Sequence, residues 1–170
     1  SQANEIEHAV GLLKEGKAVA LVRHALAPGG GDPVNFDLND CSSQRNLSEG
    51  GRTQAKRIGD FLKNSGIRHV KIYTSQWCRC RETAKLMGFG EVIDLPVLNS
   101  FFGNFSQKST QTDKLKKWLD SEPRDKPIVL ITHQVNITAF TGIFPSSGEM
   151  IIVSADGNTN SKILMRINIP

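Results

Sequence analysis

The chain has 170 residues, of which 38% are hydrophobic and 22% are charged, and its formal net charge is +4. This length predicts one domain over residues 1–170 that buries a core of its own. No apolar run approaches the ~20 residues needed to cross a bilayer, and the Lys and Arg residues are scattered rather than gathered in blocks. We therefore predict no membrane partner and no nucleic-acid partner.

In the first half of the chain, taken in order, we predict a helix over residues 4–15, a strand over 19–22 and a loop over 25–44. A helix from Ser48 to Gly66 and a strand over 70–74 follow. The first helix has apolar residues at helical spacing and stops at Gly16. The strand over 19–22 is an uninterrupted apolar run, which is typical of a parallel strand covered on both faces. The loop over 25–44 is rich in Pro and Gly and shows no period, and long loops of this kind often carry function.

In the second half of the chain we predict a helix over 77–88, a short strand over 91–95, a loop over 99–111 and an amphipathic helix before Pro123. A strand over 128–131 and a helix over 135–142 follow. Two closing strands, over 150–154 and 163–167, are joined by a turn at Asp156-Gly157-Asn158. Strands and helices thus alternate along the chain. This alternation predicts an α/β fold, a three-layer α/β/α sandwich with a mainly parallel central sheet.

Basic side chains follow three of the predicted strands. Arg23 and His24 come directly after the first strand, and His133 comes just after the strand over 128–131. The strand over 70–74 leads to Arg79. Because the carboxyl ends of neighbouring parallel strands form a common crevice, we expect these side chains to converge.

Histidines and arginines without acidic or cysteine neighbours are poor metal ligands but bind anions well. Guanidinium groups bind phosphoryl oxygens in bidentate fashion, and an imidazole can attack phosphorus while the cations stabilise the transition state. We therefore predict a phosphate site with no metal and no other cofactor, and a small phosphorylated substrate.

Four short motifs follow one another along the chain: Leu21-Val22-Arg23-His24-Ala25, then Arg45-Asn46-Leu47-Ser48-Glu49-Gly50-Gly51, then Ser75, Arg79, Thr83 and Ala84, and last Thr132-His133. In this order they resemble the RHG, R-x-L-[ST]-x-x-G, S-x-x-x-R-x-x-x-T-A and T-H signatures of the histidine phosphatase superfamily, which includes the phosphoglycerate mutases. The resemblance implies a phosphoglycerate mutase-like fold. It also implies that His24 accepts the phosphoryl group, and that Arg23, Arg79 and His133 line the phosphate pocket with it. The neighbouring arginines should lower the pKa of His24 and so keep the nucleophile neutral.

The chain departs from this family pattern at two places. Ala25 replaces the usual glycine, which is tolerable if the position does not need a positive φ. The glutamate that many members carry is missing from the segment 98–102, and the aspartate of the other branch is replaced by Gln134. As proton donor we expect Glu149, beside Gly148, and the other candidates are Asp32, Asp37 and Asp40. A leaving group of low pKa, or a phosphohistidine substrate, would need no acid.

Other polar and aromatic residues have plainer interpretations. Arg81 is read as a solvated charge, and Arg45 as a loop anchor in preference to a phosphate contact. The aromatic residues of the segment 99–111 are expected in the core or in a lid: Phe101, Phe102 and Phe105.

The three cysteines leave two readings open. A Cys41–Cys78 disulfide would tie the long loop to the helix that carries Arg79, and the alternative is three buried thiols, including Cys80. With the disulfide we expect a periplasmic or secreted protein, and without it a cytoplasmic location stays open. The first four residues are polar and carry no signal peptide, but a processed chain would look the same.

Taken together, these patterns predict a metal-independent phosphatase that acts on a phosphomonoester or phosphohistidine through a phosphohistidine at His24. A mutase of the phosphoglycerate type is an alternative, although the chain has little inserted sequence to grip a phosphoglycerate. A phosphate-binding protein without activity is the second alternative, because no standard acid is present.

Overall fold

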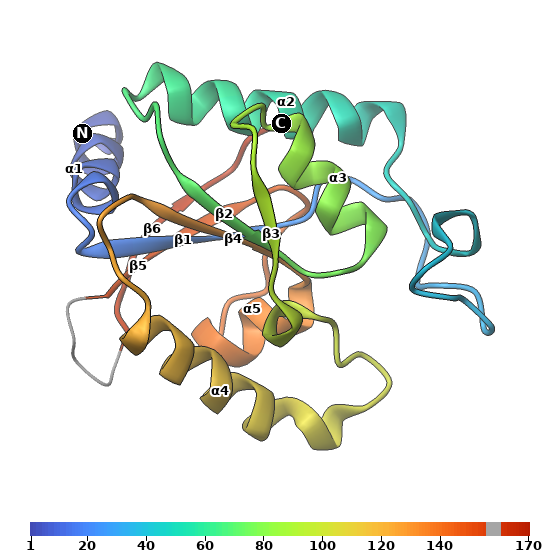
Figure 1. The fold of residues 1–170 in the computed structure, drawn as a ribbon. Helices are drawn as coiled ribbons and strands as arrows, with labels where there is room; N and C mark the ends of the chain where they lie inside the picture. The colour runs from blue at the N-terminus through green and yellow to red at the C-terminus, as the bar shows by residue number, and fades with distance from the viewer. Residues whose placement is uncertain (156–160) are drawn as a thin grey trace.

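A six-stranded sheet lies between two layers of helices in the computed structural model, which describes residues 1–155 and 161–170 (Figure 1). The strands are β1 (Ala18–Arg23), β2 (Lys71–Thr74), β3 (Val92–Asp94), β4 (Ile128–Thr132), β5 (Met150–Ser154) and β6 (Ile163–Ile167). The α-helices are α1 (Gln2–Lys14), α2 (Glu49–Asn64), α3 (Cys78–Leu86), α4 (Lys108–Ser121) and α5 (Gln134–Thr141). The turn predicted at residues 156–158 lies outside the described residues.

The strand order in the sheet is β3-β2-β4-β1-β5-β6. The pairs β3/β2, β2/β4 and β4/β1 are parallel, whereas β5 and β6 join as antiparallel strands. The predicted α/β fold with a mainly parallel sheet is therefore confirmed.

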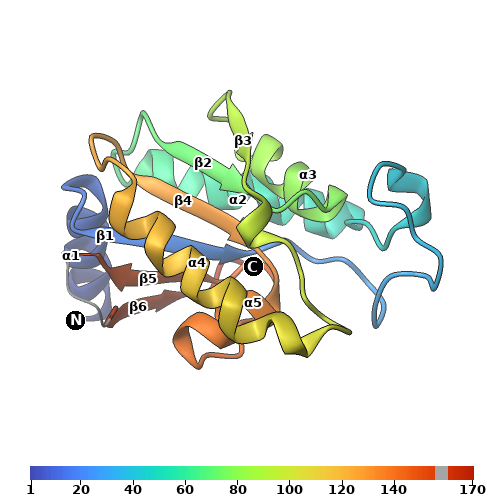
Figure 2. The same ribbon diagram turned by 60° about the horizontal axis from the view of Figure 1, so that its bottom comes forward.

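The apolar run of β1 is buried on both faces, as predicted. Ala20 and Val22 pack toward α1, α2 and α3, while Val19 and Leu21 pack toward α4 and α5. All four side chains are 0% exposed. Because successive side chains of a strand point to opposite faces, one apolar run supplies both cores. Figure 2 shows α4 and α5 together on the face opposite α2.

Strand register places the predicted site at one edge of the sheet. Arg23 at the end of β1 is paired with Thr132 at the end of β4, so His24 and His133 leave adjacent strands side by side. On the other side of β4, the Ser75 N–H donates to the Ile131 carbonyl at 3.0 Å, which brings the segment leading to α3 to the same edge.

Two glycines of α2 allow the helix to lie close to neighbouring backbone. A Cβ at Gly51 would lie 2.1 Å from the Leu26 carbonyl oxygen, and one at Gly59 would lie 2.0 Å from that of Met87. The helix begins after Ser48, whose side chain accepts a hydrogen bond from the Gly51 N–H, as its sequence position predicts. The close contact at Gly51 holds the start of the 25–44 loop against α2.

Some element boundaries differ from those predicted. The predicted loop over 99–111 is too long, because α4 begins at Lys108. Its first turn is polar and faces solvent, and the buried face starts only at Leu115, so the helix start has no periodic signal.

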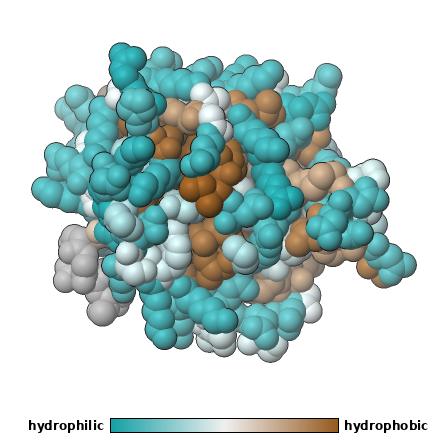
Figure 3. All heavy atoms as spheres, viewed as in Figure 1, coloured by the Kyte–Doolittle hydropathy of each residue, from teal (hydrophilic) through white to brown (hydrophobic). Residues whose placement is uncertain are grey.

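The surface seen in Figure 3 is mainly hydrophilic, with hydrophobic side chains showing over the edge strand β3. No described helix combines the length and the apolar character needed to cross a membrane.

Candidate active site

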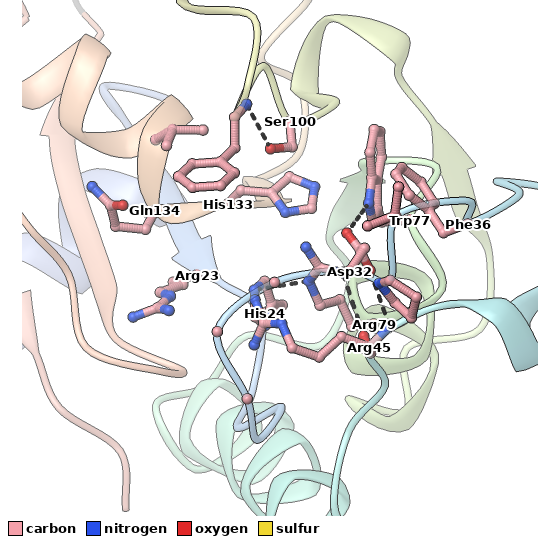
Figure 4. A pocket seen from close by; sticks show the side chains of 17 residues that line it. Arg23, His24, Asp32, Phe36, Arg45, Trp77, Arg79, Ser100, His133 and Gln134 are labelled. Atoms are coloured by element: carbon pink, nitrogen blue, oxygen red, sulfur yellow. Dashed lines mark hydrogen bonds and ion pairs between the residues drawn. The ribbon is translucent and has the colours of Figure 1, made fainter.

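A cleft of about 650 Å³ opens at the carboxyl edge of the parallel strands. Its walls come from the ends of β1 and β4, the loop 25–44, the start of α3, the loop after β3 and the start of α5. Of the predicted site residues, the cleft brings together Arg23, His24, Arg79 and His133, and it also contains Asp32 (Figure 4). Glu149 is not among its walls.

The hydrogen bonds of His24 define its tautomer. Nδ1 lies 2.8 Å from the backbone carbonyl oxygen of Ala25, which only accepts, so Nδ1 carries the proton. On the other side, Nε of Arg79 donates to Nε2 of His24 at 3.3 Å. Burial, the largest cause, and the charges of Arg79, Arg23 and Arg45 together lower the pKa of His24 to about 3. The ring is therefore neutral, with its lone pair on Nε2.

Three guanidinium groups surround this imidazole. Arg23 lies on one side of His24, and Arg45 and Arg79 lie on the other (Figure 4). Burial, and then the charge of Arg79, lower the pKa of both Arg23 and Arg45. The Nε atoms of Arg23 and Arg45 are buried without a hydrogen-bond partner among the described residues. The cleft thus holds excess positive charge and unused donors.

His133 is held from behind by the segment that precedes α3. Its Nε2 lies 2.8 Å from the hydroxyl oxygen of Ser75 and 3.5 Å from the sulfur of Cys80. The same hydroxyl oxygen accepts from the Trp77 N–H at 3.2 Å. The rings of His24 and His133 are 5.6 Å apart. Burial, followed by His24 and the arginines, lowers the pKa of His133 well below 6.5.

Asp32 is the one carboxylate among the described walls of the cleft. Its oxygens accept from Nη1 of Arg79 at 2.9 Å, from the Arg45 N–H at 3.0 Å and from Nε1 of Trp77 at 3.0 Å. Burial alone would raise the pKa of Asp32, but these hydrogen bonds outweigh it and lower the pKa. Asp32 is therefore ionised and fixes Arg79 in place.

The structure does not bring Glu149 to the place of a proton donor. Its carboxylate is 1% exposed and accepts from Nε of Arg166 at 2.7 Å and from the Ser146 N–H at 2.9 Å. It is the backbone of this segment that touches the site: the N–H of Gly148 donates to the carbonyls of Arg23 and His24. The backbone of Gly148 therefore contacts the site residues, whereas the side chain of Glu149 points to Arg166 on β6.

The two other loop carboxylates stay outside the cleft. Asp37 accepts from the Asn39 N–H, and Asp40 caps a short 3₁₀ helix at Cys41–Ser43. Arg81 is likewise outside, paired with Asp94 at 2.7 Å, as expected of a solvated charge.

Ala25 is accommodated without strain. It is 0% exposed, and no non-glycine residue in the described part of the chain has a positive φ. Its N–H donates to the Thr83 hydroxyl oxygen at 3.0 Å, and that hydroxyl donates to the Arg79 carbonyl at 2.7 Å. Thr83 therefore ties the end of β1 to the helix that carries Arg79.

The long loop is anchored to α3 by the Cys41–Cys78 disulfide, with Cα atoms 5.7 Å apart. Gln44 supports the same junction, because its side-chain oxygen accepts from the Cys78 N–H at 3.0 Å. Cys80 is the free thiol of the three and is buried, which raises its pKa to about 12. The disulfide reading of the sequence is confirmed, and it fixes the loop next to Arg79.

Sequence reasoning underrated several residues of the cleft. Arg45 does anchor the loop, by donating to the Ala27 carbonyl, but it also faces the cleft. Phe36, Trp77 and Gln134 line the cleft although no motif pointed to a role for them. Of the phenylalanines, Phe101 is in the core, 4% exposed.

The described residues contain no group of three or more His, Cys, Asp or Glu side chains placed to hold a metal ion. The polar walls of the cleft are instead cations and neutral imidazoles, with a single carboxylate that is already paired. This donor set suits an anion.

Residues 19–127 match the sequence model of the histidine phosphatase superfamily (branch 1), and the chain belongs to this superfamily. No curated protein sequence matches the chain. Its fold is similar to that of the protein histidine phosphatase SixA in complex with tungstate, with a TM-score of 0.66 and 16% identity over 89% of this chain and 96% of SixA.

Two further solved structures share the fold. A phosphoserine phosphatase from Entamoeba histolytica has a TM-score of 0.64 and 13% identity over 89% of this chain and 96% of its own. The mycobacterial glucosyl-3-phosphoglycerate phosphatase Rv2419c has a TM-score of 0.62 and 14% identity over 86% of this chain and 96% of its own.

Proposed function

We propose that the protein is a phosphatase that hydrolyses a phosphomonoester or a phosphohistidine through a phosphohistidine formed on Nε2 of His24. The observation that carries this proposal is the state of His24. Its ring is neutral, its proton is fixed on Nδ1 by the Ala25 carbonyl, and its Nε2 lies among cationic side chains in an open cleft. Membership of the histidine phosphatase superfamily supports the same chemistry.

The charges around Nε2 supply the binding energy for a phosphoryl group. The guanidinium groups of Arg23, Arg45 and Arg79 line the cleft and can donate hydrogen bonds to the phosphoryl oxygens. With Asp32 included, the charged walls carry three positive charges and one negative, so a phosphate dianion would neutralise the cleft.

The reaction has two steps. In the first, the hydrogen bond from Nε of Arg79 to Nε2 breaks and the lone pair of Nε2 attacks phosphorus. The bond from phosphorus to the leaving group breaks, and the leaving group departs with the electron pair. The arginines stabilise the charge on the phosphoryl oxygens. In the second, water attacks phosphorus, the P–N bond breaks, the electron pair returns to Nε2, and inorganic phosphate leaves.

The test is turnover of p-nitrophenyl phosphate in the presence of EDTA by the wild type, His24→Ala and the control His69→Ala, which alters an exposed histidine outside the cleft. We expect His24→Ala to lower kcat by at least about 1,000-fold and His69→Ala to leave it unchanged. Unchanged turnover in His24→Ala would exclude His24 as nucleophile.

A trapping experiment separates the phosphatase from a simple phosphate-binding protein. Rapid acid-free denaturation during turnover of labelled substrate should leave acid-labile, alkali-stable label on the wild type and none on His24→Ala. Binding of inorganic phosphate without turnover of any phosphomonoester or of phosphoramidate would instead favour a non-catalytic role.

The Cys41–Cys78 disulfide supports an oxidising compartment, such as a bacterial periplasm, as the place of action, because disulfides are rare where cellular reductants keep thiols reduced. Protein isolated without reductant should then react with a thiol reagent only after unfolding, through Cys80 alone. Reaction of all three cysteines would contradict this location.

A further inference from the structure

Aromatic side chains form the outer walls of the cleft, beyond the charged floor. Phe36 from the long loop packs against Trp77, with ring centroids 5.7 Å apart, and Trp77 packs in turn against His133. Phe102 lines the cleft from the segment after β3 and is 69% exposed. A flat group bound to the phosphate would find aromatic surface on both of these segments.

The cationic groups of the cleft lie around His24, where the phosphoryl group would bind. Its described walls hold three arginines and no lysine, and the charges of all three arginines act on the ring of His24. The other polar side chains among these described walls, Ser100 and Gln134, are neutral. This distribution favours an uncharged leaving group with an apolar face.

Among the residues that the structure describes, the cleft has no carboxyl group that is free to protonate a leaving oxygen. Asp32 accepts three hydrogen bonds through its two oxygens, one of them from the Arg79 guanidinium, and Glu149 is buried against Arg166 outside the cleft. A leaving group in this cleft must therefore be stable as an anion.

The aromatic outer walls and the lack of a free carboxyl group among the described walls favour the same leaving group. We propose that the site acts on aryl phosphates, with the ring of a phenol lying between the Phe36–Trp77 wall and Phe102 while the phosphoryl group lies on Nε2 of His24. This proposal rests on the proposed phosphatase function and adds the substrate class. In the first step the P–O bond to the ring breaks, and the phenolate leaves with the electron pair and takes its proton from water.

The size of the effect follows from the leaving groups. A phenol has a pKa of about 10, and an unactivated alcohol has one near that of water, about 16. If half of this difference of about 6 units is expressed in the transition state, kcat/KM for an alkyl phosphate falls about 1,000-fold below that for an aryl phosphate.

The experiment compares kcat/KM of the wild type for phenyl phosphate and ring-substituted phenyl phosphates with that for glycerol phosphate, glucose 1-phosphate and phosphoramidate. We expect a steep rise with decreasing pKa of the phenol and the fall of about 1,000-fold for glycerol phosphate. Equal or higher kcat/KM for glycerol phosphate, glucose 1-phosphate or phosphoramidate would overturn the proposal.

Variants of the aromatic walls test recognition of the ring. Phe36→Ala and Phe102→Ala should each raise KM for phenyl phosphate by about 3- to 10-fold, the loss expected for an aromatic contact. Turnover of acetyl phosphate, which has a good leaving group but no ring, should fall less than that of phenyl phosphate. The matched control is Phe144→Ala, which removes another exposed ring, 75% exposed, that does not line the cleft. An equal loss for acetyl phosphate, or no loss for phenyl phosphate, would contradict the proposed binding mode.

The two proposals fail in distinguishable ways. Hydrolysis of acetyl phosphate and alkyl phosphates without preference for aryl esters would leave the phosphatase function intact and overturn the substrate class. Absence of turnover with every compound, including acetyl phosphate, would overturn both.

Discussion

Two buried histidines should make the folded protein sensitive to acid. His24 is 2% exposed and His133 is 3% exposed, and burial is the main reason that the pKa of His24 falls to about 3 and that of His133 falls well below 6.5. In the unfolded chain both side chains titrate near 6.5. Below this pH the unfolded chain binds protons that the folded protein does not, so the free energy of unfolding decreases as the pH falls.

The magnitude for His24 can be worked out directly. Between pH 7 and pH 4.5 the folded protein keeps this ring neutral, whereas the unfolded ring, with a pKa of about 6.5, takes up its proton, so the free energy of unfolding falls by about 2.5 kcal/mol. His133 acts in the same direction. Since domains of this kind are stable by about 5–15 kcal/mol, the loss from His24 alone is a large fraction of the total.

Urea unfolding of the wild type, His24→Gln and His69→Gln at about pH 7 and about pH 4.5 measures this effect. His24→Gln should lose about 2.5 kcal/mol less than the wild type over this interval, and His69→Gln, at an exposed position, should lose as much as the wild type. The carboxylates with lowered pKa, such as Asp32, affect all three proteins alike and cancel in the comparison. An equal acid loss in His24→Gln and the wild type would refute the reasoning.

Three further predictions follow from other parts of the fold. Glu149→Gln should lower the free energy of unfolding by about 1–3 kcal/mol, because it weakens a buried acceptor of three hydrogen bonds, and kcat/KM for phenyl phosphate should stay within about twofold. A large loss of kcat at unchanged stability would instead indicate that Glu149 is the proton donor. Replacing both Cys41 and Cys78 by Ser should cost about 3–4 kcal/mol by urea unfolding, since the bridge closes a loop with a sequence separation of 37, and a cost below about 1 kcal/mol would show that the loop holds without it. Gly59→Ala should lower the Tm sharply, because the new Cβ would lie 2.0 Å from the Met87 carbonyl oxygen. Gly11→Ala, in open space, should raise the Tm slightly. Equal Tm values for the two variants would contradict the close approach of α2 to this backbone.

The histidines and arginines of the cleft were predictable because they follow strong local patterns. A fully apolar run predicts a strand buried on both faces, and a parallel sheet brings the carboxyl ends of its strands to one edge. His24 and His133 each follow such a run, so their meeting required only that β1 and β4 be neighbours. Four motifs in one order then indicated the superfamily.

Local sequence patterns did not identify which carboxylate, if any, faces the cleft. The sequence favoured Glu149 over Asp32 as the proton donor, and both stand near segments that lead to the site. The pairing of β5 with β6 brings Glu149 to Arg166, and the disulfide and Gln44 bring the loop carrying Asp32 onto Arg79. Contacts between residues distant in sequence decided both outcomes.

The sequence by itself determined the strand ends, and with them Arg23, His24, Arg79 and His133, because short-range apolar patterns and strand geometry fix where such residues emerge. Only the tertiary structure decided what surrounds them. The aromatic walls from Phe36, Trp77 and Phe102 come from irregular segments without periodic patterns, so their meeting over one cleft depends on how the loops fold against the sheet.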